Sequence, residues 1–367
     1  MAECRRSGCI GKGHWPAVSG FFRADRQEAA WPPPRPDPGV PAATTPAGGG
    51  WPSVTVCLCT RDNPGYARLC LESLRAQTVG PGGFEVVVVD SASRPEAAAE
   101  LRRLVAATPN ARLLRLERPG LSLARNAGAG AAAGDYVAFI DDDAAAAPDW
   151  VERIQRAVAE ADPPPAVLGG RVLPLWEAPL PPWWPASLRG VLTVSEWEGA
   201  GEYGTAEVPA GLEPYGANMV VERAALLAAG GFDERLGRQP GLLLSDEDVQ
   251  LAWKLQQGGR SARHDARIVV HHRIQAGRLT PEWLLQRLFW QGMSTVATRR
   301  LLGRPGQVWR EFPRRLAVRL LCAPAAALVS PGSTRLLALR WRHAYARGFT
   351  RMALDPRGTA VGGPRPR

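Results

Sequence analysis

Lysine is almost absent from this sequence of 367 residues: Lys12 and Lys254 are the only two, and 43 of the 45 basic residues are arginine. The chain also contains 39 glycines and 34 prolines, a composition typical of a GC-rich bacterial genome. Because such a bias enriches arginine throughout a proteome, the formal net charge of +10 says little about partners. We therefore predict no nucleic-acid binding from the charge.

Long apolar runs are also missing. No stretch of about 18 uncharged apolar residues occurs, and the longest candidate, residues 316–329, is interrupted by Arg319. The N-terminus lacks the apolar segment of a signal peptide. The six cysteines, at positions 4, 9, 57, 59, 70 and 322, repeat no zinc-site spacing. We therefore expect a cytoplasmic protein with reduced cysteines and no transmembrane helix.

The charge is unevenly distributed along the chain. Residues 1–272 carry a net charge of −5, whereas residues 273–367 contain 18 arginines and three acids and reach +15. An Arg-rich helical surface could make peripheral contact with an anionic membrane, at the inner leaflet of the plasma membrane, or it could be a solvated extension. The sequence leaves both interpretations open.

Composition divides the chain into three parts. Residues 31–50 are too rich in proline and glycine to form the interior of a helix or strand. We expect residues 1–50 to form a poorly ordered tail and linker. We expect residues 51–275 to form one domain, and residues 276–367 to form an Arg-rich helical extension. With 45% hydrophobic residues the chain can bury a sizeable core, which excludes wholesale disorder.

Strands and helices alternate after residue 52. Short β-branched runs predict strands, and runs with helical periodicity predict the helices between them. This alternation predicts an α/β fold with a mainly parallel sheet flanked by helices. An irregular loop is predicted for residues 174–210, which are rich in proline and tryptophan, and Ser245 is predicted to cap a helix. The predicted strands cover residues 53–59, 84–90, 111–116, 135–141, 218–223 and 266–272.

Three adjacent carboxylates, those of Asp141, Asp142 and Asp143, follow directly on the predicted strand YVAFI. Open parallel sheets bind ligands beyond the carboxyl ends of their strands, and adjacent acids repel one another unless a cation lies between them. Mg²⁺ and Mn²⁺ prefer oxygen ligands and leave positions open for phosphate oxygens. The triplet alone fits a divalent cation site and an acidic helix start equally well.

Three other polar residues could lie at the same edge of the sheet. Asp90 ends the second strand and could accept hydrogen bonds from a nucleobase or ribose, or it could cap a tight turn. Thr60 ends the first strand and could line the base pocket, although β-propensity also explains it. Arg125 could bind a diphosphate, because a guanidinium matches phosphate oxygens, or it could be a surface charge of its helix.

The order of these motifs resembles that of family 2 glycosyltransferases. The resemblance implies a GT-A fold, an inverting transfer, a nucleotide-diphosphate sugar donor (most often a UDP-sugar) and a divalent metal, Mn²⁺ or Mg²⁺. The family often has an aromatic residue and asparagine after the first strand's threonine, where this chain has Arg61-Asp62-Asn63. The resemblance covers roughly residues 52–272 and includes the segments VTVCLCT, VVVVDSAS, GLSLARNAG, GDYVAFIDDDA, YGANMVVER, GGFDE and LSDEDVQL.

The resemblance assigns metal and donor roles to the candidates already named. It implies that Asp141 and Asp143 bind the metal and that Asp142 holds the sugar or the metal. The remaining donor-binding candidates are Thr60, Asp90 and Arg125.

The resemblance places the catalytic base in the pair Glu247-Asp248. We choose Asp248, with Glu247 and Asp246 as the other candidates, and we expect Asp246 to contact the acceptor. The alternative is an acidic first helical turn that complements the helix dipole.

Family members often have a metal-binding histidine near the end of the last strand, where this chain has His271 and His272. Strand alternation sends the two side chains to opposite faces, so at most one can reach the metal, and we choose His271. An imidazole ligand suits Mn²⁺ better than Mg²⁺. Trp183 and Trp184 are candidates for acceptor contact, since sugars pack on aromatic rings, but they could equally hold the loop against the core.

The predicted activity is a metal-dependent inverting glycosyltransferase with a glycan, lipid-linked or natural-product hydroxyl as acceptor. A sugar nucleotidyltransferase is an alternative, but residues 53–65 lack a glycine-rich phosphate loop and a lysine. A non-catalytic interaction protein on a decayed transferase fold is another, and the intact acidic motifs count against it.

Overall fold

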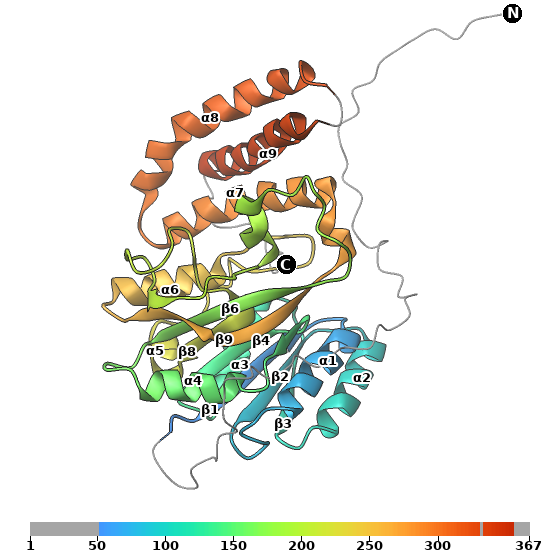
Figure 1. Ribbon diagram of the computed structural model, residues 1–367, viewed down its shortest axis with the longest axis vertical. Coiled ribbons are helices and arrows are strands. Elements are labelled where there is room, and N and C mark those ends of the chain that lie inside the picture. The colour runs from blue at the N-terminus through green and yellow to red at the C-terminus, as the bar shows by residue number, and fades with distance from the viewer. Residues whose placement is uncertain (1–50, 331–332, 356–367) are drawn as a thin grey trace, which may run out of the picture. The chain divides into compact units, whose positions relative to one another are not determined.

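The computed structural model describes residues 51–330 and 333–355, all within one compact unit. The tail and linker predicted for residues 1–50 lie outside the described residues, as do residues 356–367 of the basic segment. The six predicted strands appear in the predicted order from residue 53 onward (Figure 1). The structure adds three strands that were not predicted, Ala144–Ala146, Val167–Trp176 and Ala200–Glu202.

Nine strands of the described chain form one mixed sheet in the order β3-β2-β1-β4-β8-β6-β9-β5, with β7 paired to β9 outside this path. The strands β3, β2, β1 and β4 are parallel, and β8 runs antiparallel between β4 and β6. The bounds are β1 Val54–Thr60, β2 Glu85–Ser91, β3 Ala111–Leu116, β4 Tyr136–Asp141, β5 Ala144–Ala146, β6 Val167–Trp176, β7 Ala200–Glu202, β8 Met219–Glu222 and β9 Ala262–Ile274.

Helices cover both faces of this sheet, because alternate strand residues are apolar on each side. Val56 and Val88 pack with helices α1 (Pro64–Arg75), α2 (Pro95–Ala106) and α4 (Trp150–Ala159). Cys57 and Val89 pack on the opposite face with α3 (Leu121–Ala131), α5 (Arg223–Ala228) and α6 (Glu247–Gln257). The predicted α/β class, with a sheet flanked by helices, is confirmed.

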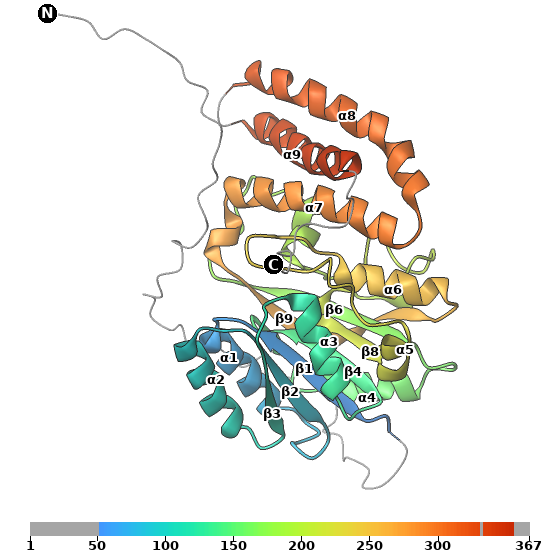
Figure 2. The same ribbon diagram turned by 180° about the vertical axis from the view of Figure 1, so that it is seen from behind.

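Three long helices follow the sheet: α7 (Pro281–Leu301), α8 (Pro305–Ala327) and α9 (Thr334–Leu354). In Figures 1 and 2, α9 lies between α7 and α8, and α7 lies nearest the sheet. Gly348 permits a close approach of α9 to α7, since a Cβ there would lie 1.9 Å from the carbonyl oxygen of Phe289. None of the helices in the described ranges is long and apolar enough to cross a membrane.

Two local predictions differ from the structure. The irregular segment is shorter than predicted, because β6 continues to Trp176 and a 3₁₀ helix, η1, occupies Ala186–Leu192. The cap of α6 is Asp246 rather than Ser245, and its backbone has the unusual φ of 72°. The carboxylate of Asp246 accepts from Gln291 on α7, so a tertiary contact sets this helix start instead of a local side-chain cap.

Candidate functional site

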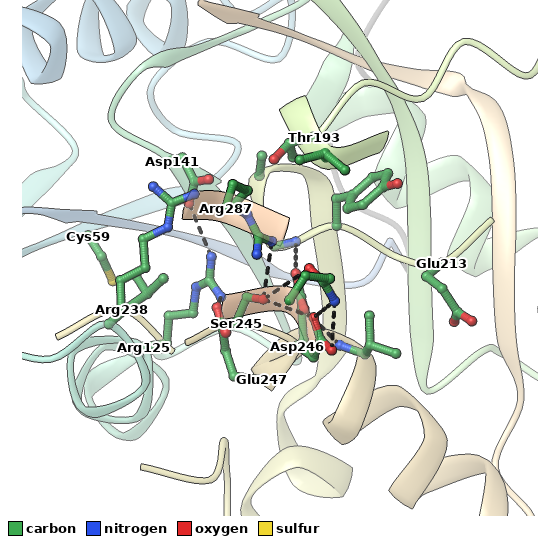
Figure 3. Close-up of a pocket in the computed structure, with 18 of the residues that line it drawn as sticks. Cys59, Arg125, Asp141, Thr193, Glu213, Arg238, Ser245, Asp246, Glu247 and Arg287 are labelled. Atoms are coloured by element: carbon green, nitrogen blue, oxygen red, sulfur yellow. Dashed lines mark hydrogen bonds and ion pairs between the residues drawn. The ribbon is translucent and has the colours of Figure 1, made fainter. Parts of the chain in front are cut away.

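A cavity of about 680 Å³ opens at the carboxyl ends of β1, β2 and β4 (Figure 3). Parallel strands present these ends at one edge, which brings together residues far apart in the sequence. The start of α6 and one face of α7 close the cavity on another side. Its lining includes Thr60, Arg125, Asp141, Asp142, Asp143, Asp246, Glu247 and Asp248, eight of the candidates predicted from the sequence.

Asp141, Asp143 and His272 form one cluster in this cavity. Each offers a ligand atom, and the three atoms lie within 4.8 Å of one another. Nε2 of His272 lies 3.1 Å from Oδ1 of Asp143, and both side chains are buried. Burial alone would raise the pKa of Asp143, but the charges of His272 and Arg278 hold it well below its usual range.

His272, and not the predicted His271, is the histidine beside the acids. Strand β5 pairs antiparallel with β9, so that Ala144 lies opposite His272 and Asp143 comes next to it. Because successive side chains of a strand point to opposite faces, His271 lies on the other face of β9. The sequence analysis predicted that only one of the two histidines could reach the acids. Burial and the charge of Arg171 lower the pKa of His271, whose buried Nδ1 has no hydrogen-bond partner among the described residues.

Asp142 is not part of this cluster, and its carboxylate accepts a hydrogen bond of 2.6 Å from Oγ1 of Thr60. Burial, together with the charge of Asp143, raises the pKa of Asp142 to about 8. The register of β1 and β4 explains this contact, because Cys59 lies opposite Asp141 and the next residues of both strands meet at the edge. Thr60 therefore orients an acid next to the cluster.

Arg125 connects the cluster to the start of α6. Its buried guanidinium donates to Glu247 at 2.7 Å and to Asp141 at 3.1 Å (Figure 3). Burial alone would lower the pKa of Arg125, but Glu247 and Asp141 raise it above its usual range. Gly216 allows this placement, since a Cβ there would lie 2.3 Å from Nη2 of Arg125.

The three acids at the start of α6 have different surroundings. Asp248 accepts from the backbone N–H of Gly216 at 2.7 Å and lines the cavity. Glu247 is buried, and burial together with the charge of Asp248 raises its pKa to about 7. Asp246 is held by Gln291 and by the hydroxyl of Ser245. Among the described residues, Glu247 is bonded to the side chain of Arg125 and Asp246 to that of Gln291, whereas Asp248 accepts hydrogen bonds only from backbone N–H groups.

Asp90 does not line the cavity. Its buried carboxylate accepts from the backbone N–H of Ser93 at 2.8 Å and forms an ion pair with Arg115 on β3. Ser91, the next residue, lines the cavity instead. The structure therefore gives Asp90 the turn-capping contact that was the alternative to nucleobase binding.

Trp183 and Trp184 also lie away from the cavity, in contrast to the predicted acceptor contact. Trp184 is buried, its ring centroid is 5.4 Å from that of Trp183, and it packs near Trp283 of α7. Packing against the C-terminal helices, which buries Trp184 fully and Trp183 partly, explains their position. The same segment does reach the cavity through smaller residues, Ser187, Gly190, Val191 and Thr193.

Sequence reasoning missed several arginines that line the cavity, among them Arg238, Arg278 and Arg287. Arg278 donates to Asp143 at 2.8 Å, and Arg287 donates to the hydroxyl of Ser245 at 3.1 Å. Within the described residues, the guanidinium of Arg238 has no hydrogen bond or ion pair, and Figure 3 shows it beside Asp141. Arg278 and Arg287 belong to the strongly basic segment after residue 272, but the high arginine content of this segment does not show which arginines line a cavity and which lie on the surface.

Comparisons with known proteins agree with this geometry. Residues 55–184 match the model of Glycosyl transferase family 2. A solved structure, "Mannosyltransferase PcManGT from Pyrobaculum calidifontis in complex with GDP-Man and Mn2+", aligns with a TM-score of 0.52 at 20% identity. The alignment covers 84% of this chain and 90% of that one, so the two share the GT-A fold.

Curated relatives include the glucosyl-dolichyl phosphate glucuronosyltransferase of Haloferax volcanii, 33% identical over 179 residues, which are 48% of this chain and 55% of the relative. The pre-mycofactocin glycosyltransferase of Mycobacterium tuberculosis is 29% identical over 252 residues, 67% of this chain and 48% of the relative. The chain thus spans about half the length of these two. The succinoglycan biosynthesis protein ExoM of Rhizobium meliloti is 27% identical over 289 residues, 77% of this chain and 86% of the relative.

Proposed function

Since the chain carries a domain of glycosyl transferase family 2, we propose that it transfers a sugar from a nucleotide-diphosphate donor to an acceptor hydroxyl, with inversion at the anomeric carbon. One observation carries the proposal. The metal-type cluster of Asp141, Asp143 and His272 shares a single cavity with Asp248, an acid suited to take a proton. Such a reaction needs both a cationic centre for the leaving diphosphate and a base for the acceptor.

Asp141, Asp143 and His272 would hold Mn²⁺ or Mg²⁺. The ligand set fits, because two carboxylates and one imidazole nitrogen suit Mn²⁺, and Asp141 remains about one-third exposed toward the cavity. His272 at 3.1 Å and Arg278 at 2.8 Å from Asp143 favour the anionic form of this carboxylate, which is the form that binds a metal. When bound, the metal would supply positive charge for the departing diphosphate.

Asp248 is our choice for the base. Its Oδ2 is oriented by the N–H of Gly216, and its Oδ1 accepts from the N–H of Val249. In the transfer, the acceptor O–H gives its proton to Asp248, the acceptor oxygen bonds to the anomeric carbon, and the bond from that carbon to the diphosphate oxygen breaks. Glu247 serves a different role, since its pairing with Arg125 fixes the start of α6 beside the cluster.

The donor would lie between the ends of β1 and β2 and the arginines of the cavity. Thr60, Arg61 and Ser91 line the end where the nucleoside fits, and Arg238 offers donors for the diphosphate. We propose a UDP-sugar as the donor. The structural neighbour was solved with GDP-Man, so a guanine nucleotide is the comparison to test.

For the acceptor we propose a hydroxyl of a glycan, a lipid-linked sugar or a natural product. Glu213, Tyr215 and Thr193 line the cavity and offer polar groups to it, and the first two lie close enough to Asp248 to feel its charge. We further propose that the chain works in the cytoplasm with its basic C-terminal segment in peripheral contact with an anionic membrane, because residues 273–367 carry +15.

The test is a panel of UDP- and GDP-sugars with the full chain in the presence of Mn²⁺, read by thermal shift and by release of nucleoside diphosphate. A donor should raise the melting temperature, because it binds only the folded state. Asp143→Ala should lose metal-dependent binding. Asp248→Asn should keep donor binding but lose about 10²–10⁴-fold in turnover. If both variants keep full activity, these roles are refuted, and if no nucleotide sugar binds, the transferase proposal fails.

A further inference from the structure

Helix α8 exposes most of the large apolar side chains that the described part of the chain leaves in solvent. Seven such side chains are more than one-third exposed, and four of them belong to α8 or its C-cap. Trp309 is 51% exposed, Leu320 62%, Leu321 66% and Leu328 90%. Exposed apolar residues are ordinary when scattered, but a group on one helix marks an interaction surface.

These residues fall on one face of the helix. Exposed Pro313, Ala317 and Pro324 lie between them, and the seven residues follow one another at intervals of four, four, three, one, three and four positions, which makes a continuous stripe along α8. We call this stripe, Trp309, Pro313, Ala317, Leu320, Leu321, Pro324 and Leu328, the α8 apolar face.

The opposite side of α8 is already occupied. Val308 is buried in a cluster with Phe349 of α9, and Arg319 donates to the hydroxyl of Thr350 at 3.0 Å. Figures 1 and 2 both show α8 as the outermost of the three long helices, with α9 beneath it. The α8 apolar face therefore points away from the rest of the described chain.

Positive charge borders this face. Arg310 and Arg314 lie next to it on the first half of the helix, and the side chain of Arg314 is 70% exposed. Glu311 is the only acid of α8, and it is 16% exposed because it pairs with Arg299, Arg314 and Arg315. The exposed side of α8 thus combines apolar groups with arginines and has no acid in its apolar stripe.

We propose that the α8 apolar face docks on an anionic lipid surface, with Leu320, Leu321 and Trp309 entering the interface and Arg310 and Arg314 contacting lipid phosphates. A helix with one apolar face bordered by basic residues has the chemistry of an interfacial helix. Tryptophan suits the interface because its ring is apolar and its N–H can still donate.

A second copy of the chain fits this face less well. In a symmetric dimer of this face, Arg310 and Arg314 of each copy would meet no free acid on the partner's α8, because Glu311, its only acid, is already paired with Arg299, Arg314 and Arg315. Lipid phosphates supply the opposite charge instead. The inference deepens the peripheral membrane contact proposed above, and it does not depend on the transfer reaction.

The test is flotation of the full chain with vesicles of phosphatidylglycerol and phosphatidylcholine in equal amounts, against vesicles of phosphatidylcholine alone, at low and high salt. We expect binding to the mixed vesicles at low salt. The variant Leu320→Ser/Leu321→Ser should lose this binding. Arg310→Gln/Arg314→Gln should weaken it about 25-fold, since each arginine near such a surface adds about fivefold. A blue shift of fluorescence on binding that is smaller in Trp309→Phe would place this ring in the lipid.

Two matched controls guard against general effects. Leu227→Ser changes another exposed leucine, on α5, and Arg102→Gln/Arg103→Gln changes two exposed arginines on α2. Both should bind vesicles like the wild type. Nucleotide-sugar binding, read by thermal shift, should be the same in every variant, which separates failure of this inference from failure of the proposed activity.

Three outcomes would overturn the inference. The first is a wild type that binds no vesicles at low salt. The second is equal binding by the wild type and by Leu320→Ser/Leu321→Ser. The third is a wild type that binds no vesicles but forms a dimer at high concentration, with the dimer lost in Leu320→Ser/Leu321→Ser. That result would show that a second copy of the chain covers the α8 apolar face.

Discussion

Arg125 and Glu247 form a buried ion pair of 2.7 Å across 122 positions of sequence, with side chains only 3% and 6% exposed. The same guanidinium reaches Asp141 at 3.1 Å. One side chain on α3 thus links the carboxyl end of β4 to the helix that carries Asp248. The spacing between the two parts of the proposed site depends on this link.

This pair predicts a strong energetic coupling. Arg125→Met leaves the carboxylate of Glu247 buried without its partner, which costs about 3–5 kcal/mol when such a pair is broken. Glu247→Leu alone should cost less, because the guanidinium of Arg125 keeps its contact with Asp141. The double variant should lose at least about 1 kcal/mol less than the sum of the singles, measured by urea denaturation of the full chain. Strictly additive losses would show that the two residues act independently.

His272 and His271 give a matched pair for testing the metal site. His272→Ala removes a nitrogen 3.1 Å from Asp143, whereas His271→Ala removes a ring on the opposite face of β9. We expect the first change to weaken Mn²⁺ binding by at least about tenfold and the second to leave it within about twofold. Calorimetric titration of the nucleotide-free protein with MnCl₂ measures both. Equal weakening would mean that the loss comes from a disturbed strand.

Strand order and helix positions could be predicted because they depend on local patterns. The run Val86 to Val89 predicts a strand buried on both faces, and that is where β2 lies in the sheet. The acidic triplet could be placed at the sheet edge for the same reason, since it follows such a run directly. These signals lie within a few residues of the feature they predict.

The rest of the site depends on contacts between distant segments. The choice between His271 and His272 depends on the pairing of β5 with β9. This pairing could not be predicted, because a strand of only three residues has no recognisable pattern in the sequence. For Trp183 the sequence allowed contact with a sugar and packing against the core equally well, because the local sequence does not show whether a tryptophan is exposed. Its packing against the C-terminal helices could be seen only in the folded structure. Arg238 lies in an irregular stretch, so no periodicity pointed to its place in the cavity.

Arg238 gives a test of diphosphate binding. Arg238→Gln removes a cavity guanidinium with no partner in the described chain, so it should leave the melting temperature within about 1 °C. The donor KM should rise about tenfold, in line with the loss of a charge-assisted hydrogen bond. Arg235→Gln, three positions away and paired with Asp233 on the surface, is the matched control and should leave the donor KM unchanged. An unchanged KM in Arg238→Gln would place the diphosphate elsewhere.

Glu213 predicts a specific dependence of stability on pH. Burial raises its pKa to about 7, although the N–H of Trp253 donates to its Oε2 at 2.9 Å and opposes the shift. The unfolded chain has a glutamate pKa of about 4.3. Between these values the folded state binds the proton more tightly, so the contribution of Glu213 to stability falls as pH rises from about 4.3 to about 7.

Replacing this carboxyl by an amide isolates that contribution. Glu213→Gln keeps an acceptor for Trp253 and cannot ionise, so the variant should match the wild type near pH 4 and exceed it by roughly 1–3 kcal/mol near pH 8. Asp142 and Glu247 also have raised pKa values, but they titrate in both proteins and largely cancel in the difference. Urea denaturation across this pH range measures the two free energies of unfolding, with Glu100→Gln on the surface of α2 as the control. A difference that is constant with pH would mean that any gain comes from packing, and that Glu213 has the same pKa in the folded and the unfolded chain.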